Sequence, residues 1–204
     1  MEAKFLSGDL HPVLQLDATV ASHPIVVDVD TPDQINAVFD MIAYNKGNKK
    51  CTKIRSNGHI FETFCGFFFF NLTGASVIRM MEDFMGPADF RSGLTAFLLK
   101  YSYKTAITED LLRELSAAST QNLNMSQIMG TWTRQKGFPV IVIGKSDGGY
   151  TLRQERFLTS NSSSEDVTSP YDYKWEVPVS YLTSENPQVV QRNWLHLDDT
   201  SLFM

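Results

Sequence analysis

Residues 39–86 read FDMIAYNKGNKKCTKIRSNGHIFETFCGFFFFNLTGASVIRMMEDFMG, and this stretch decides how the chain is interpreted. A helical pattern stops at Gly47 and resumes after Gly74. When residues 48–74 are removed on paper, one helical apolar stripe runs across the junction; it contains Phe39, Ile42, Ala43, Ala75, Val77, Ile78, Met81 and Phe84. We therefore predict that residues 48–74 are an insertion within a single helix.

The composition of the inserted segment suggests how it arose. It is basic, it holds both cysteines of the chain, Cys51 and Cys65, and it contains four consecutive phenylalanines at 67–70, which a surface loop rarely carries. A retained intron accounts for these features together, since an intron that splits a glycine codon after its first base would restore glycine at both junctions. A pyrimidine-rich tract would be translated as the phenylalanine run. A natural binding loop and an aggregation-prone hydrophobic hairpin are the alternatives.

The rest of the chain divides near Gly137 into a helical first part and a strand-rich second part. Proline at a first helical position and amphipathic spacing predict helices, whereas a period of two predicts strands. Thr108 is the expected N-cap of the third helix. We expect an extended segment at 23–29, helices at 31–47, 86–103, 108–119 and 125–137, and antiparallel sandwich-type strands at 138–143, 150–158, 174–182 and 189–197.

Charge and hydropathy exclude some classes of function. A formal net charge of -5 and a pI near 5.3 argue against binding to a nucleic-acid backbone. The longest strongly apolar run, at 64–70, is far shorter than the ~20 residues that a membrane-spanning helix needs. Residues 1–13 lack a basic start followed by an apolar core, so we expect neither a signal peptide nor a membrane anchor in the chain as given.

The sequence offers few metal-binding or modification sites. None of the four histidines shows the i, i+4 pairing of a helical zinc site, and Cys51, His59 and Cys65 match the spacing of no common zinc module. We therefore assign no metal ligand and no cofactor-binding residue. Asn-x-Ser/Thr sequences make Asn124 and Asn161 candidate glycosylation sites, with plain surface asparagines as the alternative; Asn71 is a third match.

Once the two halves are joined, several blocks in order resemble the gluzincin zinc aminopeptidases of the aminopeptidase N type. They are SHPIVVDVDTPDQINAVFDMIAYNKG at 22–47, GASVIRMMEDFMG at 74–86, TEDLLRELSAAS at 108–119 and IMGTWTRQKGFPVIVI at 128–143. Residues 9–27 are most similar to the glutamyl aminopeptidase subgroup. The resemblance implies an α+β fragment, in which 1–137 is the C-terminal helical part of a thermolysin-like peptidase domain and 138–204 is an incomplete β-sandwich domain.

The resemblance also implies an activity, the removal of N-terminal residues from peptides with Zn²⁺ bound in the complete parent enzyme. By resemblance Tyr44 donates a hydrogen bond to the oxyanion, a role that suits a neutral phenol; on the residue pattern alone it is a tyrosine at the edge of a core. The chain lacks the H-E-x-x-H motif and the family's Gly-x-Met-Glu-Asn loop, so we expect it to be inactive alone.

Other properties are implied for the parent only. They are a plasma-membrane location with the active site on the extracellular side, and assembly as a homodimer. For this chain the location stays unassigned, and a non-catalytic splice product or an interaction module is the alternative function.

Overall fold

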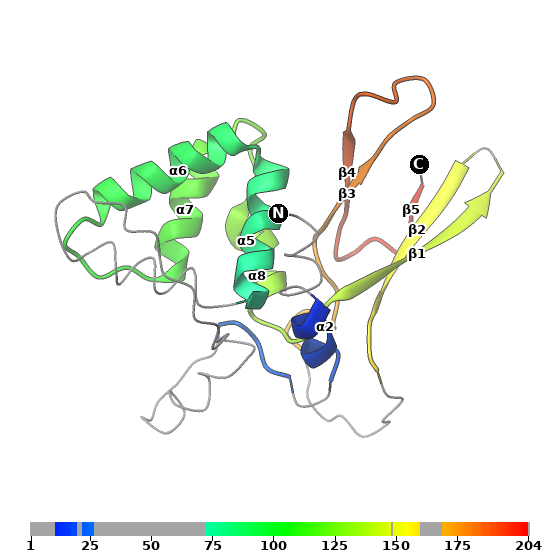
Figure 1. The fold of residues 1–204 in the computed structure, drawn as a ribbon, viewed down its shortest axis with the longest axis horizontal. Helices are drawn as coiled ribbons and strands as arrows, with labels where there is room; N and C mark the ends of the chain where they lie inside the picture. The colour runs from blue at the N-terminus through cyan, green and yellow to red at the C-terminus, as the bar shows by residue number, and fades with distance from the viewer. Residues whose placement is uncertain (1–10, 20–21, 27–71, 148, 160–168, 204) are drawn as a thin grey trace.

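The computed structural model describes residues 11–19, 22–26, 72–147, 149–159 and 169–203, and in this part helices come first and strands follow (Figure 1). The helices are α2 (His11–Asp17), α5 (Leu72–Met85), α6 (Pro87–Lys100), α7 (Thr108–Ala118) and α8 (Met125–Thr133). The strands are β1 (Pro139–Ser146), β2 (Gly149–Arg156), β3 (Val177–Tyr181), β4 (Gln191–Leu195) and β5 (Leu202–Phe203). The mixed α+β character and the change from helices to strands near Gly137 are confirmed.

The helical core confirms the predicted apolar stripes. In α5 the residues Val77, Met81 and Phe84 are buried, and Ile78 packs against them. The other helices add buried residues at the predicted spacing; these are Phe97, Leu111, Leu112, Leu115, Met125, Ile128 and Met129. Burial of one face of each helix is the main source of stability for such short helices.

Two helix ends are fixed by carboxylates. Thr108 is not the N-cap of α7 as predicted, because Ile107 holds that position and its backbone N–H donates to Asp110 Oδ2 at 3.1 Å. This bond, together with hydrogen bonding from Arg113, lowers the pKa of Asp110. At the start of α6, Asp89 Oδ2 accepts bonds from the backbone N and the hydroxyl of Thr120, each at 2.7 Å, and the pKa of Asp89 is lowered as well. The end of α7 is thereby tied to the beginning of α6.

The strands form two antiparallel sheets, one of order β1-β2-β5 and one consisting of β3 and β4. The register pairs Ile141 with Gln154 and Val177 with Leu195. The facing sides of the sheets enclose Trp175, Val177 and Leu195, with Ile141 and Leu202 packed against them. The other side of β4 faces α5, where the Trp194 and Phe84 rings meet edge to face at 5.3 Å. The β3–β4 hairpin therefore lies between the helices and the larger sheet (Figure 1).

Three expectations about local structure need correction or lie outside the described residues. Helix α2 was not predicted. Of the segment expected at 23–29, residues 23–26 are not part of a strand, and residues 27–29 lie outside the described residues. Helix α8 ends at Thr133, four residues before the predicted end. The predicted helix at 31–47 lies outside the described residues. Among the helices that are described, none has the length and apolar character needed to cross a bilayer.

Candidate functional site

Most of the residues singled out from the sequence lie outside the described part of the chain. These are Tyr44, Cys51, His59, Cys65, Asn71 and Asn161, together with residues 48–71 of the predicted insertion. Asn124 is described, and it is the exposed N-cap of α8.

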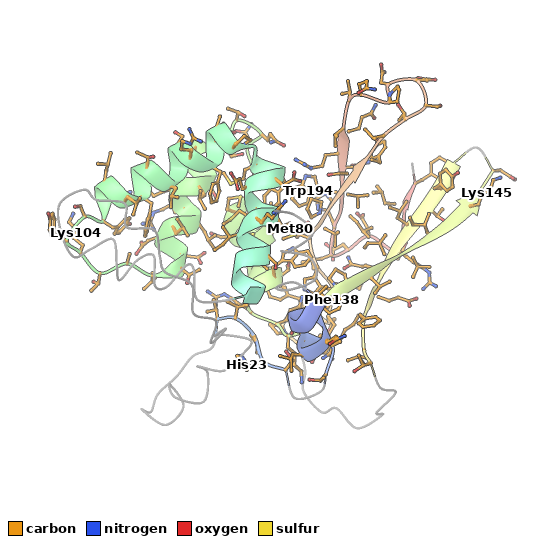
Figure 2. The ribbon with its side chains drawn as sticks, viewed as in Figure 1. His23, Met80, Lys104, Phe138, Lys145 and Trp194 are labelled. Carbon is orange, nitrogen blue, oxygen red and sulfur yellow. The ribbon has the colours of Figure 1, made fainter. Side chains whose placement is uncertain are left out.

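A cavity of about 250 Å³ lies where the N-terminal segment, α5 and the junction between α8 and β1 meet. Figure 2 labels one residue from each of these three parts, His23, Met80 and Phe138. Most of the cavity wall is apolar, and the polar lining residues are Asp17, His23, Ser76 and Gln135. A cavity of this kind takes apolar side chains or an apolar ligand more readily than water.

Asp17 holds one wall of the cavity together. It is 5% exposed, and its Oδ1 accepts hydrogen bonds from Ser22 Oγ at 2.5 Å and from the backbone N of Gly137 at 2.9 Å. Two charge-assisted bonds compensate for part of the cost of burying the carboxylate. The bond from Gly137 connects residues 120 positions apart in sequence, and so it attaches the N-terminal segment to the start of the sheet.

Gly137 occupies a position that favours glycine. Its φ of +84° lies in the left-handed region, and a Cβ atom there would lie 3.1 Å from Arg156 Nε. The Arg156 guanidinium is packed over the ring of Tyr173 at 3.8 Å from the centroid. A side chain at 137 would therefore disturb both the bond to Asp17 and the packing of Arg156.

The other polar residues of the cavity wall also have structural partners. Gln135 Nε2 donates to the carbonyl oxygens of Thr131 at 2.8 Å and Lys174 at 2.6 Å, and its Oε1 accepts from Ser169. His23 Nδ1 lies 2.8 Å from the carbonyl oxygen of Pro24. Asp17 and Gln135 therefore connect separate parts of the described cavity wall.

A second buried carboxylate lies between α8 and the sheets. Glu176 is 2% exposed; its Oε2 lies 2.6 Å from His196 Nδ1, and its Oε1 accepts from Gln127 Nε2 at 3.4 Å. The backbone oxygen of Glu176 accepts from Trp132 Nε1 at 2.8 Å. A carboxylate beside a histidine is a useful acid–base pair, but within the described residues no nucleophile contacts it, and its contacts tie α8 to the β3–β4 hairpin.

The segment that contains Tyr44 lies in sequence between residues that line the cavity. Residues 27–71, which contain Tyr44, follow Val26, whose backbone N donates to the carbonyl oxygen of Thr133 at 2.7 Å. The same segment precedes α5, which lines the cavity through Ser76, Val77 and Met80. Described residues close in sequence to each end of this segment, Ile25 and Ser76, therefore line the cavity.

The orientation of α5 is fixed at its other end. Arg192 of β4 donates from Nη1 to the carbonyl oxygens of Asp83 and Phe84, each at 3.0 Å, and its Nη2 lies 2.7 Å from Asp83 Oδ2. Gln121 Nε2 adds bonds to the carbonyl oxygens of Phe84 and Met85 at 3.1 and 3.3 Å. A cation at the C-terminus of a helix satisfies unpaired carbonyls and interacts favourably with the helix dipole.

Sequence reasoning missed these anchoring residues for different reasons. Asp17 gave no signal, because helix α2, whose C-terminal end it occupies, was not itself predicted. Arg192 and Glu176 gave none, because their partners on α5 and α8 lie far away in sequence.

Comparison with known proteins identifies the family. The family described as "Peptidase family M1 domain" matches residues 1–69 and 69–132. The chain is 33% identical over 191 residues to a glutamyl aminopeptidase of Bitis rhinoceros, which covers 93% of the chain and 17% of that protein. It is 35% identical over 179 residues to an aminopeptidase A of Gloydius brevicauda, covering 87% of the chain and 15% of the relative.

A third relative is the glutamyl aminopeptidase of Homo sapiens, with 34% identity over 187 residues, 91% of the chain and 16% of the relative. The chain thus spans only about one sixth of the length of these curated relatives. The resemblance noted from the sequence blocks is confirmed: the chain belongs to peptidase family M1 and resembles its glutamyl aminopeptidases.

Proposed function

We propose that this chain is part of an aminopeptidase that removes single residues from the N-termini of peptides, with Tyr44 as the hydrogen-bond donor to the oxyanion of the tetrahedral intermediate. Membership of the M1 family supports the reaction class. The observation that carries the proposal is the position of α5, which begins next to the segment that contains Tyr44 and is held rigidly at its far end by Arg192.

The proposal includes the insertion of residues 48–74. Without them Gly47 joins Ala75, which already lies inside α5, and Tyr44 precedes Ala75 by four residues, or about one helical turn. The buried stripe of α5 supports this arrangement, although α5 begins at Leu72, inside the predicted insertion. In the joined chain α5 would set the direction of the Tyr44 side chain.

The chemistry assigned to Tyr44 needs such rigidity. A neutral phenol aimed at developing negative charge stabilises the transition state more than the ground state, and loss of one such donor typically lowers turnover by about 10² to 10³. The donor has to be held within about 0.5 Å of its productive position. Unrelated residues beginning four positions after Tyr44 would remove that constraint, so we propose that the chain with residues 48–74 is inactive alone.

The zinc ion that the family implies is assigned to the complete parent enzyme. In the described part of the chain no three His, Cys, Asp or Glu residues gather in a way that would hold a metal, and the described carboxylates Asp17 and Glu176 are engaged in structural bonds. The whole sequence also contains no H-E-x-x-H motif. The described residues do not fit a zinc site, and the catalytic contribution of this chain is limited to the Tyr44 hydrogen bond.

The remaining assignments follow from the same proposal. Residues 1–137 would be the C-terminal part of the peptidase domain and 138–204 part of a β-sandwich domain, a division supported by the transition between α8 and β1. The parent would be a membrane-anchored ectoenzyme, acting on peptides outside the cell as a homodimer.

Substitution of Tyr44 in the longest protein encoded by the transcript tests the proposal. Tyr44→Phe is expected to lower kcat for an aminoacyl-aminomethylcoumarin about 10²- to 10³-fold with little change in KM, because the phenol acts mainly in the transition state. Tyr103→Phe is the matched control, since Tyr103 is 83% exposed at the end of α6. An unchanged kcat for Tyr44→Phe, or metal-dependent hydrolysis by the present chain alone, would contradict the proposal.

A non-catalytic interaction module is the second candidate, favoured by apolar side chains exposed on the strands and next to β4. Ile143, Val190 and Phe203 are 64%, 62% and 57% exposed. If the chain is such a module, light scattering should show assemblies that Ile143→Lys disperses; a monomer at all concentrations would favour the enzyme fragment.

A further inference from the structure

The Asn124-Met125-Ser126 sequence at the start of α8 has the arrangement of an N-glycosylation acceptor, and the proposed function makes no use of it. Asparagine followed by any residue except proline and then serine or threonine is the acceptor pattern. Of the three matches in the sequence, Asn124 is the one within the described residues.

The two polar atoms of the Asn124 side chain have different roles. The carbonyl oxygen Oδ1 accepts from the backbone N of Gln127 at 3.2 Å and so caps α8. The oligosaccharide would bind to the other atom, Nδ2, which makes no hydrogen bond to any described residue. Glycosylation keeps the amide carbonyl, so the modified side chain can still accept the Gln127 bond and cap the helix.

The backbone around Asn124 is fixed by its neighbour. Met125 is fully buried in the helical core, and its backbone N donates to Ser116 Oγ at 2.9 Å. Asn124 itself is exposed. Because the oligosaccharide is added before the chain folds, the folded site has to leave it room in solvent, and an exposed N-cap next to a buried anchor meets that condition.

The exposed residues near Asn124 in sequence are polar. Thr120, Gln121, Asn122 and Gln127 are all exposed, polar and uncharged. The large exposed apolar residues lie elsewhere; Leu99, Tyr103 and Ile107 precede α7, and the others belong to the strands and their loops. In the fully described stretch 108–139 no large hydrophobic residue is exposed, so a glycan at Asn124 would cover no apolar docking surface.

We propose that Asn124 is glycosylated when the chain enters the secretory pathway, an inference that rests on the extracellular placement in the proposed function. The Asn124 Nδ2 attacks the anomeric carbon of a polyprenyl-diphosphate-linked oligosaccharide. The Nδ2–carbon bond forms, the carbon–oxygen bond to the diphosphate breaks, the polyprenyl diphosphate leaves, and Nδ2 loses one proton.

The test is expression of the whole chain behind a cleavable signal peptide in mammalian cells. Secreted and cell-associated protein are both treated with peptide N-glycosidase F in H₂¹⁸O, and mass spectrometry locates asparagines converted to ¹⁸O-labelled aspartate. We expect conversion at Asn124 in the wild type and in Ser126→Thr, which preserves the acceptor sequence. Because transfer takes place during translocation, protein that is retained in the cell is as informative as secreted protein.

Two variants separate the glycan from the helix cap. Ser126→Ala keeps the Asn124 cap but removes the acceptor sequence, and Asn124→Asp keeps a capping oxygen but lacks the nitrogen that takes the sugar. Both are expected to lose the Asn124 glycan completely and to retain the fold of α8. An unmodified Asn124 in translocated wild-type protein would overturn the inference; it would leave the peptidase proposal intact, since that depends on Tyr44.

Discussion

Arg192 is predicted to be the strongest single link between the strands and α5. Its guanidinium binds two carbonyl oxygens at the C-terminus of α5 and the carboxylate of Asp83, while its Nε donates to Ser180 Oγ at 3.2 Å. Arg192→Met removes all four bonds and keeps most of the apolar stem. We expect this substitution to lower the free energy of unfolding and to loosen the C-terminal turn of α5.

The magnitude follows from the exposure of each partner. The Asp83 side chain is 70% exposed, so its ion pair with Arg192 is screened by solvent and is worth less than about 1 kcal/mol. The Arg192 side chain is only 23% exposed, and hydrogen bonds to a charged group contribute about 1.5–3 kcal/mol. The carbonyls at the helix end keep partial access to water and to Gln121, which offsets part of the loss. We therefore expect a destabilisation of about 2 kcal/mol, of which Asp83→Asn should reproduce less than half.

Urea unfolding followed by circular dichroism, together with hydrogen exchange at the end of α5, measures the effect. Arg153→Met is the matched control, because Arg153 is 56% exposed and pairs with Glu155 on its own strand. The control should change the free energy of unfolding by less than about 0.5 kcal/mol. If Arg192→Met and Arg153→Met are equally mild, and exchange in α5 is unchanged, the proposed anchoring of α5 by β4 is wrong.

Three further predictions concern other parts of the chain. Both Gly137 and Gly86 have positive φ, so alanine at either position should destabilise the fold, by about 1–2 kcal/mol at 86. Gly137→Ala should cost more, because a Cβ at 137 would lie 3.1 Å from a guanidinium nitrogen, whereas one at 86 would meet nothing within 4 Å. Thermal unfolding of the two variants tests this order. The pKa of Asp110 is lowered, chiefly by its bond from the Ile107 backbone N–H, so its contribution to stability is complete above the unfolded-state pKa of about 3.9 and is lost as pH falls through the lower folded-state value. The difference in unfolding free energy between wild type and Asp110→Asn should therefore be constant from about pH 5 to 7 and shrink below about pH 4. A pH-independent difference would count against this role of Asp110. Deletion of residues 48–74 should raise soluble yield and protease resistance, because it removes the phenylalanine run and restores one continuous helix; an unchanged yield would argue for a natural loop.

Local patterns predicted the elements whose stability is local. Helices α6, α7 and α8 and the four longer strands follow from amphipathic spacing, proline at first helical positions and alternation. Helix α2 has only seven residues, too few for a period to be recognised, and isolated helices of that length are marginal in water. It is held by distant contacts, among them the bond from the Thr159 backbone N to the Ala18 carbonyl oxygen at 3.1 Å.

The candidate site could be predicted only in part for the same reason. The bonds from Asp17 to Gly137 and from Arg192 to α5 join residues more than 100 positions apart, and no local spacing in the sequence encodes them. The N-cap of α7 was predicted one residue too late: Ile107 holds that position, and its backbone amide donates to Asp110. Tyr44 came from the family resemblance alone, and its role stays a prediction.

Full-length sequencing of the transcript, both upstream of Met1 and across residues 47–75, tests the central claim most directly. The account predicts a mature transcript that encodes an H-E-x-x-H motif in frame upstream and joins Gly47 directly to Ala75. A mature transcript in which translation starts at Met1 and residues 48–74 are always present would contradict it, and the function of the chain would then have to be sought in binding.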